Sequence, residues 1–185
     1  MAWSEVHKQT SRLKILDSAA VLFMEHGFDH IGINDVMQHA GLTRGAFYNH
    51  FSSKAELYRE AILRAAKVSS EGVAKQSNGC VKTMVDTYVD VNHRNGTAFR
   101  CPLAFLTTDI HHQDDDVRNV YTQIFKRLLG VLSQGDTNTL APEVIEKSIL
   151  MVGSIAISRA INDEELAQAI LKTCRDKVKE GFESA

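Results

Sequence analysis

Apolar residues recur with a helical period over most of this chain. Between about residues 10 and 26, and again over residues 33–40, apolar side chains fall three to four positions apart. This spacing places them on one face of a helix. Glycine is common directly after a helix because it adopts left-handed backbone conformations without strain. We therefore expect Gly27 to end the first helix and Gly41 to end the second.

A third and very short helix is expected next. Thr43 is a favourable N-cap residue for it, and Phe47 and Phe51 form its apolar pair. Residues 53–56 then have the sequence of a capping box, in which a serine and a glutamate satisfy backbone donors at the start of a helix. This box opens a fourth helix, which we expect to run to about Lys75.

The remaining pattern predicts five further helices. The chain has only two prolines, and its strand-type alternation is weak, so long helices are possible almost everywhere. The expected helices cover residues 80–94, 102–110, 114–132, 142–161 and 163–179. Residues 133–141 are polar and are expected to form a loop. The predicted fold class is therefore all-α, with about nine helices.

Composition restricts the class of protein further. The chain has 185 residues, of which 44% are hydrophobic and 24% are charged, which excludes an intrinsically disordered chain. No apolar run approaches the roughly 20 residues of a membrane span, and residues 1–8 lack the apolar stretch of a signal peptide. Three scattered cysteines do not make a disulfide framework. We therefore expect a cytoplasmic protein without membrane association.

The two short helices over residues 33–51 have the arrangement of a helix-turn-helix unit. Gly45 lies in the first turn of the second of these helices, where a glycine does not stabilise a helix. It would let the helix approach DNA closely. Arg44 can form a bidentate contact with guanine in the major groove, and Tyr48 and Lys54 can reach phosphates.

A structural interpretation of the same unit is also possible, because helix-turn-helix geometry occurs in proteins that never touch DNA. Gly41, Leu42, Phe47 and Phe51 are expected to be scaffold under either interpretation. The net charge of −2 does not by itself point to nucleic acid. The candidate DNA-contacting residues are Thr43, Arg44, Gly45, Ala46, Tyr48, Asn49, His50 and Lys54.

Residues 15–54 resemble the DNA-binding region of the TetR family of bacterial transcriptional regulators. The most specific part of the resemblance is residues 41–57, and the stretches 100–103 and 158–163 are similar to one common branch of the family. The sequence departs from the family pattern at Gly32, where a hydroxyl residue is usual. It also departs at Asn49, where histidine is frequent.

The resemblance implies a domain organisation and a function. It implies a helix-turn-helix DNA-binding domain over residues 1–54 and a helical ligand-binding and dimerisation domain over residues 55–185. The expected protein is a homodimeric repressor that binds a palindromic double-stranded DNA operator and is released by a small-molecule inducer. An activator with the same fold is an alternative.

The resemblance also places an inducer pocket among the C-terminal helices. Its candidate lining residues are Tyr88, Phe99, Cys101, Phe105, Tyr121 and Phe125. An ordinary core role is the alternative for each of them. Cys101 precedes Pro102 at an expected helix N-terminus and follows Arg100, a setting that lowers the pKa of a thiol. A thiol-based sensor of electrophiles or oxidants is therefore a second hypothesis, and a small buried residue is its alternative.

The last two expected helices carry more apolar surface than one side of a small domain needs. They are expected to form a four-helix bundle with a second copy, although the excess can also pack within the monomer. The candidate interface residues are Ile149, Val152, Gly153, Ala156, Ala160 and Ile170.

Catalytic and metal-binding motifs are the remaining possibilities. His111 and His112 precede three aspartates, but adjacent helical side chains point about 100° apart, so we expect no metal site. The sequence has no glycine-rich phosphate loop and no nucleophile elbow. We therefore expect neither enzymatic activity nor a cofactor.

Overall fold

The computed structural model describes residues 2–133, 141–180 and 182, and within these ranges it holds helices and no strands. The expected loop 133–141 lies largely outside the described residues. The elements are α1 (Ala2–His30), α2 (Ile33–His39), α3 (Arg44–Phe47), α4 (Lys54–Ser77), α5 (Val81–Tyr88), α6 (Val91–Arg94), α7 (Pro102–Phe105), the 3-10 helix η1 (Ile110–His112), α8 (Asp115–Leu132), α9 (Pro142–Ala160) and α10 (Glu164–Glu180). The all-α prediction is confirmed.

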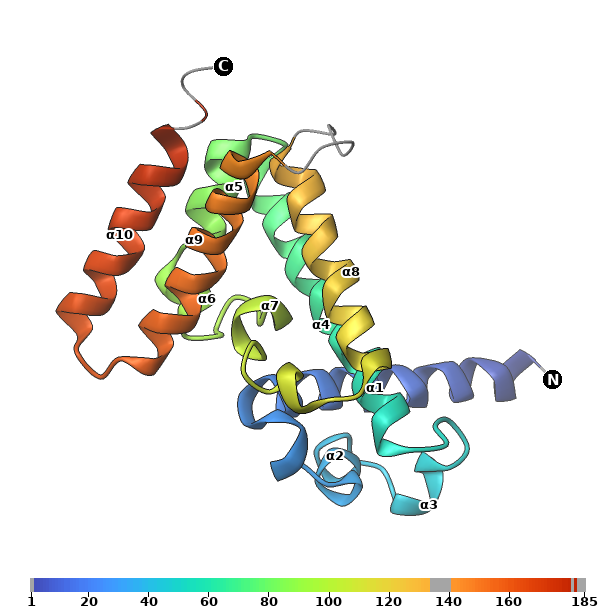
Figure 1. Ribbon diagram of the computed structural model, residues 1–185. Helices are drawn as coiled ribbons and strands as arrows, with labels where there is room; N and C mark the ends of the chain where they lie inside the picture. The colour runs from blue at the N-terminus through green and yellow to red at the C-terminus, as the bar shows by residue number, and fades with distance from the viewer. Residues whose placement is uncertain (1, 134–140, 181, 183–185) are drawn as a thin grey trace.

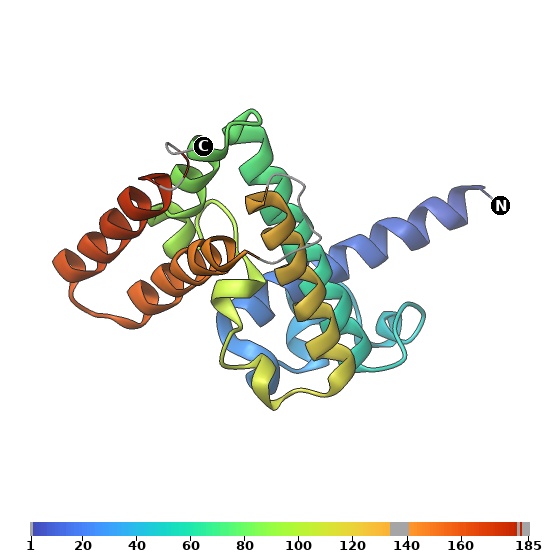
Figure 2. The same cartoon turned by 45° about the horizontal axis from the view of Figure 1, so that its top comes forward.

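Helix α1 begins earlier than the apolar pattern predicts. Its first turns carry exposed side chains over residues 5–10 and project beyond the rest of the molecule (Figures 1 and 2). These turns pack against little of the protein, which agrees with the absence of an apolar stripe in their sequence. Gly27 breaks the helix as expected, with φ 76° and ψ 179°, and the chain resumes helical geometry as far as His30.

Helix α4 joins the two halves of the molecule. Its N-terminal part packs against α1, where the Tyr58 ring meets Phe23 and Phe28 at centroid distances of 4.9 Å each. Its C-terminal part packs against α5 and α8. A single contiguous core therefore runs from the helix-turn-helix unit into the C-terminal helices. The boundary expected at residues 54/55 falls at the start of this shared helix.

The predicted capping box at the start of α4 is half correct. Ser53 Oγ accepts a hydrogen bond from the Glu56 backbone N–H at 3.1 Å. The Glu56 carboxylate, however, accepts from the backbone N–H of Ser52 at 2.7 Å rather than from that of Ser53. The reciprocal bond is therefore displaced by one residue.

Two expected helices are interrupted in the structure. The helix predicted over residues 80–94 is split into α5 and α6. Asp90 lies between them with an extended backbone, and its carboxylate caps α6 by accepting the Asn92 backbone N–H at 2.8 Å. The helix predicted from Pro102 to Ile110 ends at Phe105. The next residues turn so that Asp109 reaches α1 and α4.

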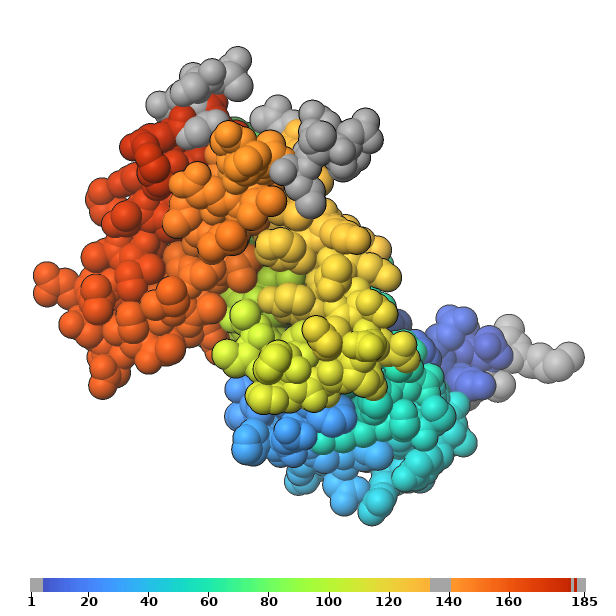
Figure 3. Space-filling view, in the orientation of Figure 1, coloured from blue at the N-terminus to red at the C-terminus, as the bar shows by residue number. Residues whose placement is uncertain are grey.

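Helices α9 and α10 form an antiparallel hairpin on one side of the molecule, away from α2 and α3 at the other end (Figures 1 and 3). Within the described residues, no helix combines the length and the apolar character that a membrane crossing needs.

Candidate nucleic-acid interface

The turn between α2 and α3 is held by backbone contacts and two buried aromatic rings. Gly41 has φ +67°, a conformation that side-chain-bearing residues avoid, and the Leu42 N–H donates to the Met37 carbonyl at 2.9 Å. Phe47 is fully buried and Phe51 is 2% exposed. These contacts fix α3 against the body, so that the other side of α3 faces outward.

The outward side of α3 carries the expected DNA-contacting residues. Thr43, Arg44, Gly45 and Asn49 are exposed, and Ala46 is half-buried. The Tyr48 side chain is 59% exposed while its ring rests edge-on against Phe47 at 5.2 Å. The structure therefore brings these six residues together on one open surface.

No feature of the surrounding structure explains why residue 45 is a glycine. Its φ is not in the left-handed region. Apart from its two chain neighbours and the adjacent backbone of its own helix, a Cβ atom placed on it would meet no atom of the described residues within 4 Å. Gly41 is different, because its backbone conformation requires glycine. A glycine that neither conformation nor packing requires is expected where another molecule approaches the helix closely.

Lys54 and His50 lie differently from the simple expectation of exposed contacts. The Lys54 ammonium lies 4.1 Å from the centroid of the Phe28 ring, in a cation–π contact inside the protein. His50 is half-buried, and its pKa is lowered by burial and by the charges of Lys8 and Arg12. Its Nδ1 atom has no hydrogen-bond partner among the described residues.

The N-terminal part of α1 supplies cations that the candidate list did not include. Lys8 and Arg12 lie close enough to His50 to lower its pKa. The Arg12 guanidinium lies 4.8 Å from the centroid of Phe51 and forms an ion pair with Glu60 at 2.5 Å. Lys14 is exposed on the same helix. The run of basic residues over 7–14 was the available signal.

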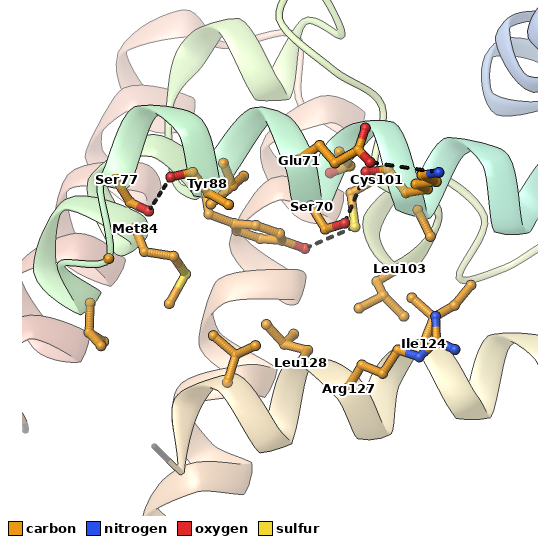
Figure 4. A pocket seen from close by; sticks show the side chains of 18 of the residues that line it. Ser70, Glu71, Ser77, Met84, Tyr88, Cys101, Leu103, Ile124, Arg127 and Leu128 are labelled. Atoms are coloured by element: carbon orange, nitrogen blue, oxygen red, sulfur yellow. Dashed lines mark hydrogen bonds and ion pairs between the residues drawn. The ribbon is translucent and has the colours of Figure 1, made fainter. Parts of the chain in front are cut away.

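A large cavity lies between α4, α5, α7 and α8 (Figure 4). Its volume is about 740 Å³, within the usual size range of small-molecule sites. Of the six expected lining residues, Tyr88 and Cys101 line it. Most of the apolar wall comes instead from α4 and α8, including Val73 and Ile124. The continuation of the apolar stripe along α4 was the missed signal.

The other four expected lining residues lie outside the cavity wall. Phe99 packs against the buried His93 ring at 4.5 Å, and Phe105 lies 3.4 Å from the Arg159 guanidinium. Tyr121 donates its hydroxyl hydrogen bond to the Leu103 carbonyl at 2.8 Å, and Phe125 packs against the core. These four aromatic residues have core roles.

Of the two hypotheses for Cys101, the structure favours the small buried residue over the reactive thiol. Cys101 is 5% exposed, and burial raises the pKa of its thiol. Arg100 does not offset this effect, because it forms an ion pair with Glu25. Cys80 has the setting that was expected for Cys101: it is exposed at the start of α5, and hydrogen bonds from Thr83 lower its pKa.

The α9–α10 hairpin presents an apolar surface to solvent. Ile149 is 59% exposed, Ile157 is 55% exposed and Leu166 is 49% exposed. Gly153, Ala156 and Ile170 are half-buried and Ala160 is exposed, whereas Val152 is 8% exposed and lies in the core. Ile157 and Leu166 were not among the candidate interface residues.

The aspartates of residues 114–116 make capping and ion-pair contacts within the protein. The Asp114 carboxylate accepts the Val117 backbone N–H at 2.9 Å and caps α8. Among the described residues, no group of three or more potential ligands is placed to hold a metal ion.

The helical fold and the open face of α3 define a class: helix-turn-helix proteins with a helical C-terminal half. Residues 15–61 match the model of the bacterial regulatory proteins, tetR family. Residues 15–61 therefore carry the DNA-binding segment of the TetR family, and this match supports a TetR-family regulator.

Curated relatives and solved structures agree with this assignment. The chain is 32% identical over 103 residues to the HTH-type transcriptional repressor AcnR of Corynebacterium diphtheriae, covering 53% of this chain and 51% of that protein. It is 38% identical over 71 residues to an HTH-type transcriptional repressor of Mycobacterium tuberculosis, covering 36% of this chain and 38% of the relative. The alignments thus span about half or less of these relatives.

A solved TetR-family transcriptional regulator from Cytophaga hutchinsonii has the same fold over nearly the whole chain. Its TM-score is 0.77 at 19% sequence identity, and the match covers 94% of this chain and 96% of that one.

Proposed function

We propose that this protein is a homodimeric, sequence-specific DNA-binding repressor that acts in the cytoplasm on a palindromic operator and is released by a small-molecule inducer. The observation that carries the DNA-binding part is Gly45, which lies on the exposed side of α3 without any internal reason to be glycine. The repressors among its relatives support the same function.

The exposed residues of α3 divide into two kinds of contact. Arg44 can read a guanine by two parallel hydrogen bonds in the major groove. Thr43 and Tyr48 carry hydroxyl groups that suit phosphate oxygens, and the Thr43 hydroxyl is available because it does not cap α3. Lys8 on α1, whose charge acts on His50, adds positive charge beside this surface.

In this proposal, Asp109 links the cavity to the DNA-binding unit. Its carboxylate accepts the Phe28 backbone N–H at 3.1 Å and the Tyr58 hydroxyl hydrogen. It lies on the segment that follows α7, and α7 carries Leu103 of the cavity wall. A ligand that moves α7 therefore changes how α1 and α4 are held.

Release from DNA is then a population shift between two arrangements of the DNA-binding units. A ligand shifts the equilibrium only by the difference between its affinities for the two arrangements. An activator would use the same contacts. The position of the operator relative to the promoter distinguishes the two.

In-vitro selection of duplexes from a random pool tests this function, with Gly45→Ala as the decisive variant. The substitution is expected to leave the midpoint of thermal unfolding unchanged or slightly raised, since alanine favours a helix by about 0.5–1 kcal/mol over glycine. Affinity for the selected duplex should fall at least about tenfold, because a new methyl group stands between α3 and the groove. Unchanged affinity for the duplex would remove the observation on which the proposal rests.

A further inference from the structure

The hydroxyl groups that line the cavity already have partners inside the protein. The Tyr88 hydroxyl donates to Cys101 Sγ at 3.5 Å (Figure 4). Ser70 and Ser77 donate to backbone carbonyls three residues earlier in α4, at 2.9 and 3.3 Å. A ligand acceptor therefore gains little from these hydroxyl groups, since each bond to a hydroxyl hydrogen would replace an existing one.

Of the charged side chains that line the cavity, one cation is available to bind a ligand. Lys67 Nζ lies 3.8 Å from the Glu71 carboxylate on the same helix. Arg127, on α8, has no ion pair or hydrogen bond within the described part of the chain, and its side chain extends into the space between α8 and α4 (Figure 4). The charged groups in the lining therefore carry a net +1, concentrated at Arg127.

The rest of the wall is apolar and elongated. Lining residues on α4 run from Leu63 to Ser77, which is about 21 Å of helix at about 1.5 Å per residue. Leu63 and Val131 are 39% and 54% exposed although both are apolar. Such a wall favours a long hydrophobic body, because burial of apolar surface is the main gain that it can offer.

We propose that this cavity binds an elongated hydrophobic molecule with one anionic head group, with its body between α4 and α8 and its head group on Arg127. The inference rests on the proposed function, in which the cavity is the inducer site. The guanidinium can hold a carboxylate or a sulfonate through two parallel hydrogen bonds.

Direct binding of three probes that share one alkyl chain and differ in head group tests the proposal. The experiment contains no DNA, so its result is independent of the DNA-binding claim. The probes are dodecanoate, dodecanol and dodecyltrimethylammonium, titrated calorimetrically into the full chain below their aggregation concentrations. Dodecanoate should bind about five- to tenfold more tightly than dodecanol, as expected for charged hydrogen bonds in a partly exposed site. The cationic probe should bind most weakly.

Two variants separate the head-group contact from general surface charge. Arg127→Gln should reduce the affinity for dodecanoate to that for dodecanol and leave dodecanol binding unchanged. Lys126→Gln removes a neighbouring exposed cation that does not line the cavity, and it should preserve the preference for dodecanoate.

Chain length tests the hydrophobic body. Affinity should rise about three- to fourfold per methylene from octanoate to dodecanoate, at about 0.8 kcal/mol per buried methylene. Ala66→Phe, which places a ring in the cavity lining, should weaken all the probes together. The proposal is overturned if no probe binds, if the three head groups bind equally, or if Arg127→Gln keeps the preference for dodecanoate.

Discussion

Arg44 and Tyr48 lie side by side on the exposed surface but are expected to contribute differently to DNA binding. Arg44→Ala should cost about 1–3 kcal/mol on the selected duplex and relax sequence preference at one base pair, because it removes a base contact. Tyr48→Phe keeps the ring against Phe47 and removes only the hydroxyl, so it should weaken binding to all duplexes by a similar factor. Affinities for the selected duplex and for single-base variants of it measure both effects. An equal loss on every duplex for Arg44→Ala would contradict direct reading of a base.

His93 is a buried histidine that should make stability depend on pH. It is fully buried, and burial lowers its pKa from 6.5 to about 4. Its Nδ1 lies 2.6 Å from the Tyr88 carbonyl, so this nitrogen carries the proton of the neutral ring, and Nε2 has no partner among the described residues. The folded protein therefore binds the second proton less readily than the unfolded chain does.

The sign of the effect follows from that lowered pKa. Stability from a neutral His93 is fully present above about pH 6.5 and is lost as the pH falls toward 4, by up to about 3 kcal/mol. Urea unfolding at pH 7 and pH 4.5 measures it, with His93→Gln as the comparison because glutamine does not titrate. The wild-type protein should lose more stability than the variant over this interval. Equal losses would mean that other groups account for the pH dependence.

At the scale of elements, Gly27 breaks α1 where Asp109 docks. It has φ +76°, and a Cβ atom there would lie 2.8 Å from Asp109 Oδ1, whereas Gly41 has φ +67° with open space around it. Gly41→Ala should cost about 1–2 kcal/mol for the left-handed conformation alone. Gly27→Ala should cost at least about 1 kcal/mol more, because its backbone (φ 76°, ψ 179°) lies in a region almost restricted to glycine and the new methyl group also displaces the carboxylate that holds Phe28 and Tyr58. Chemical denaturation of both variants measures the difference, and equal costs would show that Asp109 moves aside freely.

The sequence predicts most of the helices because their signals are local. The breaks at Gly27 and Gly41, the N-cap at Ser53 and the proline at the start of α7 are each visible in a few neighbouring residues. The early end of α7 is not predictable in this way. It depends on Asp109 reaching a backbone N–H and a hydroxyl 81 and 51 residues away, and a helical period contains no information about such partners.

The candidate site was predictable to different degrees for the same reason. The exposed face of α3 follows from the positions of Phe47 and Phe51, because their spacing of four residues predicts that both lie on the buried side, as they do. The cavity wall does not follow, because aromatic residues such as Phe99 fill the core as readily as they line a pocket. The burial of Cys101 depends on the packing of α4 and α7 around it, which its sequence neighbours do not reveal.

At the scale of the whole molecule, the exposed apolar residues of α9 and α10 are expected to be covered by a second copy. Ile157→Glu places a charge in the middle of that surface and should convert the dimer to a monomer, with the helical content unchanged. Val68→Glu is a matched control, because Val68 is 41% exposed on α4, away from the α9–α10 hairpin. Sedimentation velocity measures the oligomeric state. A dimer that survives Ile157→Glu would place the interface on another surface.

The most direct test of the account is a footprint of the wild-type protein on its selected duplex, with the stoichiometry of the complex measured in parallel. A symmetric dimer that places one α3 in each of two successive major grooves should protect two inverted half-sites about 34–36 Å apart. The complex should contain either one dimer on one pair of half-sites or two dimers on two overlapping pairs. A single protected half-site with one bound monomer, or uniform protection without a preferred sequence, would contradict a dimeric repressor that reads a palindrome.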